Sequence, residues 1–532
     1  MPITPTYPGV YIEEIPSGVR TIVGVATSIT AFLGRAQRGP TDEPITINSF
    51  GDFTRTFGDL HVDYPMTYSV RDFYLNGGQQ AIIVRLQKGA AKSKNDDIKL
   101  EAASPGLWGD KVVYTVDTKG ITDDVATRYN IAKADLFNLT LYEDPPNGRV
   151  ERFLNVAIKL DAGARRLDRV LEAESSLARV LKKADGTPDL PATTPTPSTP
   201  AEDPADPAAD PTKYKKLAGG KDSAYFDNKT DFIGDKDKKT AMYALEKADL
   251  FNLLCIPPDT RDGDPPTGTY NDAMQYCADR RAMLIVDPPA LWGANKETAA
   301  ATARDGLTGL SLTGPGARNA ALYFPRVQQS DPMRDGQIDV FVPCGIVAGV
   351  MARTDVNRGV WKAPAGLDAT LNGVQGLQVN LNDPENGMLN PLGINCLRAF
   401  PVTGRVVWGA RTLRGADQLS DDYKYVPVRR LALYLEESLY RGLKWVVFEP
   451  NDEPLWAQIR LNAGAFMHNL FRQGAFQGKT PAEAYFVKCD KETTPQNDIN
   501  LGIVNVVVGF APLKPAEFVI IKLQQMAGQI QA

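Results

Sequence analysis

The chain has 532 residues, of which 43% are hydrophobic and 23% charged, and its formal net charge is −5. These values are typical of a globular protein with roughly two to four domains, and the negative charge gives no reason to expect nucleic-acid binding. No apolar run approaches the roughly 20 residues that cross a bilayer, and the first residues lack the basic and apolar regions of a signal peptide. We therefore expect synthesis in the cytoplasm and no direct membrane insertion.

The first 20 residues contain a short segment with the alternation of a β-strand. Pro8 and Pro16 bound it, and Gly18 separates it from the rest of the chain. Such a segment is either an edge strand of its own molecule or a strand lent to a neighbour, because both use the same exposed backbone groups. The candidate contact residues are Val10, Tyr11, Ile12, Glu13 and Ile15.

Residues 21–87 and 217–393 have the alternation of a layered α/β core domain. An apolar run at 29–33, a helical pattern at 66–75 and a buried run at 81–86 begin it. After residue 217, strand patterns alternate with helical ones, which indicates an α/β layer structure. We expect strands at 251–256, 282–286 and 320–324, helices at 271–280 and 299–307, and a closely packed helix within the segment 343–366, which is rich in small residues.

An insertion of different character lies between the two parts of this core. Residues 88–183 form a separate module, which we expect to end with an amphipathic helix at 164–181. Residues 184–216 are rich in proline and acidic side chains and have too little apolar surface to fold. We interpret them as a stiff, solvated linker, with a regulatory or partner-binding tail as the alternative.

Residues 394–515 are expected to form a further domain. Its longer helix has an apolar stripe and an opposite stripe that is polar and carries little negative charge, with Gln458, Asn462, Asn469 and Arg472. The expected elements are helices at 428–439 and 455–472 and strands at 444–448, 484–489 and 503–508.

The end of the chain, residues 516–532, contains an apolar, β-rich run. Pro512 and Pro515 precede it, and two prolines so close together disfavour a tight hairpin onto the same sheet. An apolar strand attached by such a stiff connecting segment can pair with a sheet in another molecule. The residues concerned are Phe518, Val519, Ile520, Ile521 and Leu523.

The sequence contains little material for catalysis. His61 and His468 are the only histidines, and the five cysteines are far apart, so we expect buried free thiols and no catalytic, cofactor-binding or metal-binding residue. The stretch GAFQGKT at 474–480 is similar to a phosphate-binding loop, but it has three residues between its first glycine and its GK pair, where such a loop has four. A helical pattern also precedes it, where a strand is required. An α/β hydrolase is an alternative class, which nucleotide binding in solution would favour.

Five separated stretches resemble the tail sheath proteins of contractile phage tails and related injection machines. In chain order they are TYPGVYIEEIPSG, INCLRAFPVTGRVVWGARTL, FEPNDEPLW, GAFQGKTPAEAYFVKCD and DINLGIVNVVVGFAPLKPAEFVI. The resemblance covers both ends and most of the middle, and it implies a mixed α/β and α+β multidomain fold. The implied parts are a sheath core, an inserted outer domain at 88–183, a tube-facing domain at 394–515, and β-strand arms at 1–20 and 516–532.

The resemblance also implies a function. The chain would be a structural sheath subunit, not an enzyme, that polymerises as a helical cylinder around an inner tube and contracts to drive the tube through a target envelope. Its implied partners are copies of itself in stacked hexameric rings, an inner tube protein, and baseplate and tail-terminator or cap proteins. It would be part of a phage tail or of a contractile injection particle, and a non-contractile tube or baseplate component is the alternative.

By the same resemblance, both arms interlock with a sheet in the 394–515 domain of neighbouring subunits. The implied acceptor residues are Ile503, Val504, Val506 and Val508. The alternative for the 455–472 helix is that it only packs inside its own domain, because its apolar stripe must be buried there in any case. The resemblance instead implies that this helix faces the tube, with Arg460 and Arg472 as contacts to an acidic tube surface, through Gln458, Arg460, Asn462, Asn469 and Arg472.

Overall fold

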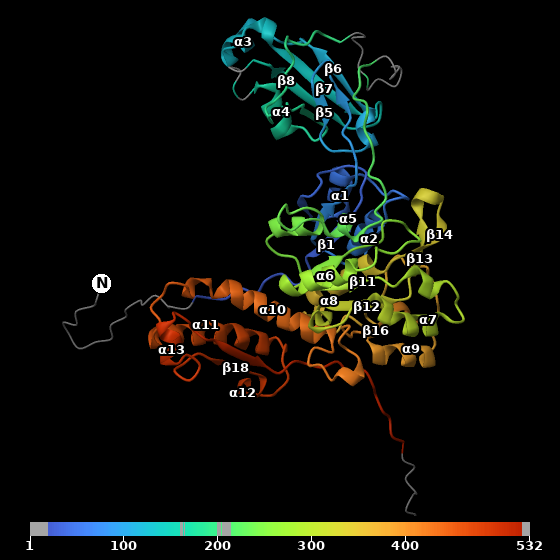
Figure 1. The fold of residues 1–532 in the computed structure, drawn as a ribbon, viewed down its shortest axis with the longest axis vertical. Helices are drawn as coiled ribbons and strands as arrows, with labels where there is room; N and C mark the ends of the chain where they lie inside the picture. Colours follow the sequence, from blue (N-terminus) through green and yellow to red (C-terminus); the bar gives the residue numbers. More distant parts are fainter. Residues whose placement is uncertain (1–19, 160–162, 164, 199–203, 205–213, 524–532) are drawn as a thin grey trace, which may run out of the picture.

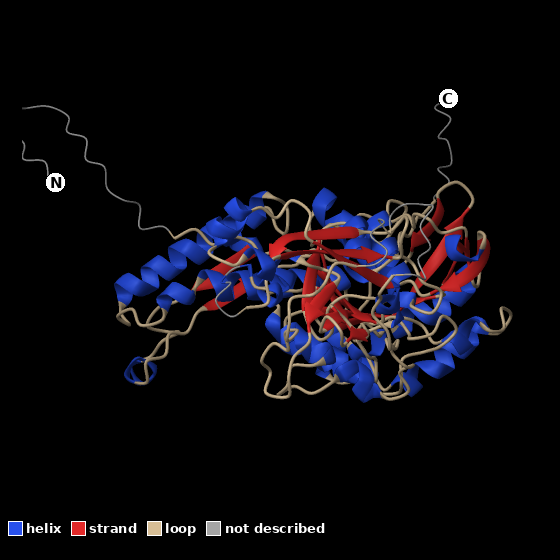
Figure 2. Ribbon diagram, turned by 90° about the horizontal axis from the view of Figure 1, so that it is seen from above, coloured by secondary structure: helices blue, strands red, loops and turns tan. Residues whose placement is uncertain are grey.

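The computed structural model describes residues 20–159, 163, 165–198, 204 and 214–523. Three bodies follow one another in Figure 1: an insertion domain at the top, a central core, and a C-terminal region at the lower left. Figure 2 shows the C-terminal helices extending away from the core. The predicted N-terminal arm residues, Val10 to Ile15, lie outside the described part of the chain. Within the described residues, no helix combines the length and apolar character needed to cross a membrane.

An eight-stranded sheet forms the centre of the core. Its strand order is β17-β16-β12-β11-β10-β1-β3-β2, parallel from β16 to β3 and antiparallel at both edges. Strands buried on both faces have uninterrupted apolar sequences, which explains why the inner strands could be predicted. The strands are β1 (Thr30–Gly34), β2 (Pro44–Ile47), β3 (Ala81–Arg85), β10 (Leu253–Cys255), β11 (Met283–Val286), β12 (Ala320–Phe324), β16 (Ile394–Phe400) and β17 (Gly404–Val407).

Helices cover both faces of this sheet. The helices α5, α6, α7 and α9 pack on one face and α1, α2 and α8 on the other. A Cβ added at Gly345 of α8 would lie 2.0 Å from the carbonyl oxygen of Ser69 in α2, so the close packing predicted from small residues is confirmed. The ranges are α1 (Phe50–Phe57), α2 (Pro65–Leu75), α5 (Lys229–Ile233), α6 (Thr269–Asp279), α7 (Ala299–Gly306), α8 (Cys344–Arg358) and α9 (Asp383–Leu389). A small sheet of β13 (Val327–Asp331), β14 (Gln337–Phe341) and β15 (Gly376–Leu377) lies beside them.

The insertion domain has a separate hydrophobic core between two three-stranded sheets and a helix, α4. The helix predicted at 164–181 is shorter than expected. It ends at Glu174 because the Glu151 carboxylate accepts hydrogen bonds from Ser175 and Ser176, and β9 then pairs with β5. The elements are β4 (Lys94–Asn95), β5 (Leu100–Ala102), β6 (Val112–Asp117), α3 (Asp123–Tyr129), β7 (Phe137–Glu143), β8 (Val150–Val156), α4 (Leu167–Glu174) and β9 (Ala178–Val180).

The described part of the proline-rich segment lies against the insertion domain and is not a free spacer. The backbone N–H of Asp189 donates to the carbonyl of Leu181 at 2.7 Å, and that of Ser198 donates to Val116 at 2.8 Å. Leu190 packs partly buried against the domain's core. Residues 184–198 are exposed or half-buried, as a solvated segment should be, but backbone hydrogen bonds attach them to the insertion domain.

The C-terminal region consists of two long antiparallel helices and a two-stranded sheet. Helix α10 leads away from the core, and α11 returns towards it (Figure 1). The predicted strand at 444–448 is instead a short 3-10 helix at Lys444–Val446, and the last strand begins at Val507, not at residue 503. The ranges are α10 (Val426–Gly442), α11 (Glu453–Arg472), α12 (Pro481–Ala484), β18 (Tyr485–Lys488), α13 (Gln496–Asn500) and β19 (Val507–Phe510).

Candidate inter-subunit surfaces

The first described residues run along the C-terminal helices before they enter the core. The backbone N–H of Arg20 donates to Asn462 Oδ1 at 3.0 Å, and that of Val25 donates to Ser438 Oγ at 3.2 Å. Ile22 is buried in the cluster that joins α10 and α11. The C-terminal helices, and not the core sheet, therefore hold the first described residues of the chain.

Asn462 is not on the exposed face of α11, contrary to the sequence-based expectation. Its exposed fraction is 1%, and it holds the backbone of Arg20. The helical spacing explains this position, because Asn462 lies three residues after Ile459 and four before Phe466, both buried. The asparagine thus belongs to the apolar stripe, where the backbone N–H of Arg20 satisfies its Oδ1, whereas its Nδ2 has no partner among the described residues.

Three of the five residues predicted to lie on the exposed face of α11 are exposed. They are Gln458, Asn469 and Arg472. Arg460 is half-buried, and its guanidinium pairs with Glu453 at 2.6 Å and also donates to a backbone carbonyl. Arg460 therefore has partners within its own chain, whereas Arg472 forms no ion pair with any described residue.

Glu517 attaches the root of the C-terminal segment to the core. Arg411 Nε and Nη2 donate to its two carboxylate oxygens at 2.8 and 2.6 Å, and the Tyr425 hydroxyl donates to Oε2 at 3.1 Å. The Arg411 side chain is only 1% exposed. A forked arginine–carboxylate pair fixes both the position and the direction of the chain. Glu517 is the sole acidic residue after Asp498 in the sequence. A single carboxylate in this otherwise apolar and basic end could have indicated the residue that attaches it to the core.

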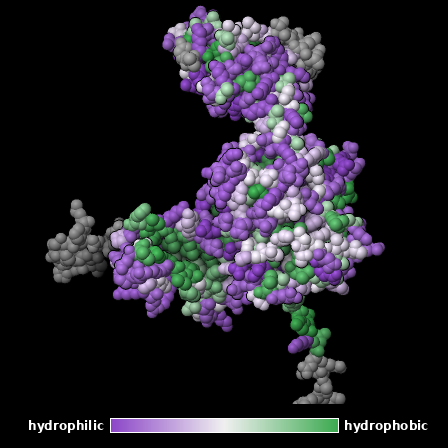
Figure 3. All heavy atoms as spheres, viewed as in Figure 1, coloured by the Kyte–Doolittle hydropathy of each residue, from purple (hydrophilic) through white to green (hydrophobic). Residues whose placement is uncertain are grey.

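The apolar run after Glu517 is exposed to solvent. Figure 3 shows it as a green segment that projects below the core. It forms no helix or strand within the described residues. The exposed fractions are 74% for Phe518, 82% for Val519, 83% for Ile520, 77% for Ile521 and 93% for Leu523. Five consecutive or nearly consecutive apolar side chains in water indicate a segment that another surface covers.

The predicted acceptor sheet is present but begins later in the sequence. β18 and β19 pair antiparallel, and neither pairs with a further strand among the described residues. Of the four predicted residues, only Val508 lies in β19. Val504 and Val506 precede it and pack against the N-terminal half of α11, and Ile503 is 43% exposed. The outer edges of both strands leave backbone groups that an added strand could satisfy.

The stretch at 474–480 does not have the geometry of a phosphate loop. It comes directly after helix α11, and the carboxylate of Glu483 accepts hydrogen bonds from the backbone N–H groups of Lys479 and Thr480. These donors are therefore occupied by the chain itself. Among the described residues, no group of three or more His, Cys, Asp and Glu side chains could hold a metal ion. All five cysteines are free and buried, as expected.

One buried carboxyl group lies at the end of a core strand. Asp287 comes directly after β11, is 3% exposed, and accepts the backbone N–H of Cys344, the first residue of α8, at 2.9 Å. Its other oxygen has no partner among the described residues. Burial raises the pKa of Asp287 to about 7.

This raised pKa predicts a pH dependence of stability. The folded state binds the proton more tightly than the unfolded state, so the free energy of unfolding decreases as the pH rises from about 4 to about 7. The decrease amounts to a few kcal/mol at most, since one pKa unit corresponds to about 1.4 kcal/mol. We expect Asp287→Asn to remove this pH dependence of the free energy of unfolding. The measurement is the free energy of unfolding of variant and parent, from urea denaturation curves at pH 5, 6, 7 and 8. The difference between the two proteins should change with pH. A constant difference at all four pH values would contradict the assignment.

Comparisons with known proteins identify the family of the chain. The model of the phage tail sheath protein central domain matches residues 233–413, and that of the phage tail sheath C-terminal domain matches residues 418–525. A tail sheath protein of Vibrio phage KVP40 is 27% identical over 176 residues, which are 33% of this chain and 25% of that relative. The chain belongs to the phage tail sheath family, and it is a structural sheath protein of mixed α/β fold.

Solved structures extend the likeness of the fold to nearly the whole chain. The sheath of an extracellular contractile injection system, PVC, in its contracted state has a TM-score of 0.56 at 22% identity over 98% of both chains. The contracted helical sheath of the anti-feeding prophage has a TM-score of 0.55 at 22% identity, over 98% of this chain and 100% of that one. A sheath tail protein from Listeria innocua has a TM-score of 0.58 at 13% identity, over 93% and 96%.

Proposed function

We propose that copies of this chain polymerise as a helical cylinder around an inner tube, and that the cylinder contracts to drive the tube through a target envelope. One observation carries the proposal. The first described residues and the segment around Glu517 are held at separate places, by the buried side chains of Asn462 and Arg411, and the C-terminal region holds a two-stranded sheet with open edges. These are the parts that linking one molecule to its neighbours requires.

We propose that the two arms complete the β18–β19 sheet of neighbouring subunits. The N-terminal arm would use Val10 to Ile15 and the C-terminal arm Phe518 to Leu523. A sheet of two strands has two outer edges, so it can accept one strand on each. Contacts of this heterologous kind need not close on themselves and so build helical tubes.

The proposed radial order places the insertion domain outside and the C-terminal region against the tube. The insertion domain and the C-terminal region lie at different ends of the core, which supports this order (Figure 1). During contraction the insertion domain, the core and the C-terminal region would move as rigid bodies about their connections. The arms would keep neighbouring subunits linked throughout. The further partners proposed are an inner tube protein and baseplate and cap proteins, within a phage tail or a contractile injection particle.

The exposed stripe of α11 is the proposed contact with the tube. We expect Arg472→Glu to weaken co-assembly with the tube protein several-fold and to spare self-assembly, because Arg472 has no ion pair with a described residue of its own chain to lose. Arg460 is a poor test, since its reversal would also break the pair with Glu453. The measurement is a pull-down of tube protein, with Lys296→Glu on the core as the control. Equal recovery of the tube by Arg472→Glu and by the parent would refute the contact.

Electron microscopy of the purified chain, alone and with its tube protein, tests the function itself. We expect striated hollow cylinders, wide when the chain assembles alone and narrower around a tube. Cylinders of one fixed diameter under every condition would favour a non-contractile component. Monodisperse particles under both conditions would overturn the proposal.

A further inference from the structure

Phe448 is a bulky side chain that a strained backbone holds in solvent. Its exposed fraction is 102%, its φ is +71°, and it lies in the loop between α10 and α11. A side chain with a Cβ rarely adopts this left-handed conformation, and a bulky one even less often. The loop is held in place because Val446 packs beside the start of α11 and its carbonyl accepts the N–H of Glu449 at 3.1 Å. Strain that the surrounding structure maintains commonly marks a functional position.

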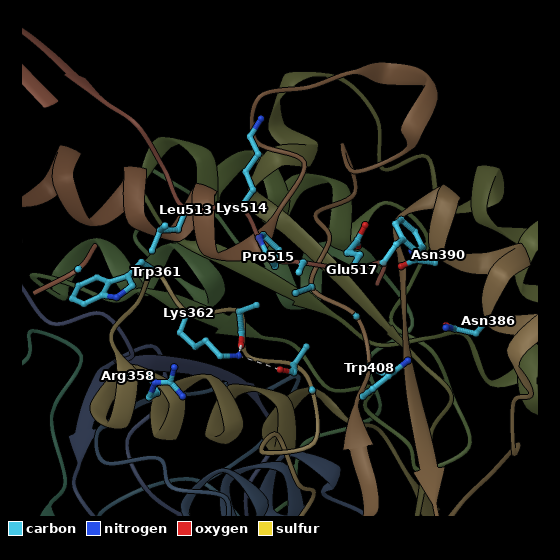
Figure 4. A pocket seen from close by; sticks show the side chains of 18 of the residues that line it. Arg358, Trp361, Lys362, Asn386, Asn390, Trp408, Leu513, Lys514, Pro515 and Glu517 are labelled. Carbon is cyan, nitrogen blue, oxygen red and sulfur yellow. Dashed lines mark hydrogen bonds between the residues drawn. The ribbon is translucent and has the colours of Figure 1, made fainter. Parts of the chain in front are cut away.

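A hollow of about 680 Å³ lies at the opposite end of α11. The helix has 20 residues and is therefore about 30 Å long. Phe448 precedes its first turn, whereas Gln473 and Gly474, directly after its last turn, line the hollow. Trp361 and Trp408 stand on opposite sides of this space, and residues Leu513 to Glu517 line a further side of it (Figure 4). The space is thus large enough for an aromatic side chain and is lined by aromatic rings.

The charges at the two ends of α11 are complementary. Arg358, Lys362 and Lys514 line the hollow, and none of them forms an ion pair with a described residue. The one carboxylate in the lining, Glu517, is already occupied by Arg411. At the other end, Glu449 is exposed beside Phe448 and has no ion pair with a described residue. An aromatic side chain followed by a carboxylate therefore matches a hollow with aromatic walls and unpaired cations.

We propose that residues 447–449 of one copy insert into this hollow of a second copy, with Phe448 between the two tryptophans and Glu449 facing the cations. The contact is heterologous, because the inserted loop and the hollow are different surfaces of the same chain. Repeating it produces an open row of C-terminal regions. The inference deepens the proposed self-assembly, on which it rests, by naming a side-chain contact in addition to the strand exchange.

Cysteine cross-linking tests the contact in assembled protein. The five native cysteines are buried, so a short bis-maleimide should react with introduced surface thiols. We expect a mixture of Glu449→Cys and Lys514→Cys subunits to give covalent dimers. The double variant should give a ladder of cross-linked oligomers. Either single variant alone should stay monomeric on a denaturing gel. Dimers of Glu449→Cys alone would indicate a symmetric contact and overturn the inference, as would the absence of any cross-link in intact cylinders. If the parent forms no cylinders, the proposed function fails instead.

A second variant separates assembly from folding. Asparagine tolerates the left-handed conformation, so Phe448→Asn should leave the melting temperature unchanged or raised and weaken self-association roughly tenfold or more. Val402→Asn, which alters a 99% exposed residue between β16 and β17, is the control and should change neither value. A fall in melting temperature with unchanged association would mean that Phe448 has only a structural role. Restored assembly in Glu449→Lys combined with Lys514→Glu would support the charge pairing.

Discussion

A chain that ends at Glu517 is expected to fold normally and to form no long cylinders. The truncation removes the exposed apolar side chains from Phe518 to Leu523 but keeps the pair between Glu517 and Arg411. Because the removed side chains contact little of their own molecule, we expect the free energy of unfolding to change by less than about 0.5 kcal/mol. Cylinder length in electron micrographs and the urea midpoint are the two measurements.

A chain that ends at Leu523 is the matched control for this truncation. It retains the whole apolar run and loses only residues 524–532, so it should still form long cylinders. Normal cylinders from both truncated chains would refute the proposed role of Phe518 to Leu523. Loss of cylinders from both would mean that residues after Leu523 also contribute.

Replacing Asp355 by alanine is expected to cause the largest loss of stability. Its two oxygens accept from Arg430 Nη1 and Nη2 at 2.9 and 2.5 Å, and Oδ2 also accepts from Thr27 Oγ1 at 2.6 Å. The two charged side chains are 4% and 3% exposed. These contacts join the N-terminal segment, α8 and α10, and so connect the core to the C-terminal region.

The expected loss is about 3–5 kcal/mol, because Asp355→Ala leaves the Arg430 charge buried without its partner. The free energy of unfolding from urea denaturation is the measurement. Asp305→Ala, which removes an exposed ion pair with Arg304, is the control and should have no measurable effect. A loss as small as that of the control would show that water enters the junction and solvates Arg430.

Local sequence patterns predicted the elements of the core well. The strands expected at 282–286 and 320–324 correspond to β11 and β12, and the helix expected at 455–472 corresponds to α11. These elements are buried on a whole face or on both faces, so their hydrophobic period appears in the sequence. The strand expected at 444–448 was wrong, because a short apolar run is compatible with either a strand or a helical turn.

The candidate sites were only partly predictable. The exposed stripe of α11 agrees with helical spacing for Gln458, Asn469 and Arg472, and the same spacing places Asn462 on the buried side. The apolar run after Pro515 was recognisable from composition, and its solvent exposure shows that it does not fold back onto its own sheet; its pairing with a neighbouring molecule stays a prediction. The N-terminal arm residues lie outside the described part of the chain, so their role stays a prediction.

The sequence by itself determined the layered core, the position of the insertion and the membership of the sheath family, because each depends on periodicity or on contiguous stretches of residues. Only the tertiary structure decided where the first described residues and the segment around Glu517 are held, and which surfaces can meet. Arg411 and Glu517 are 106 residues apart, and Arg20 and Asn462 are 442 apart. Contacts between such distant residues leave no local pattern, since they form only when packing of the apolar faces brings the segments together.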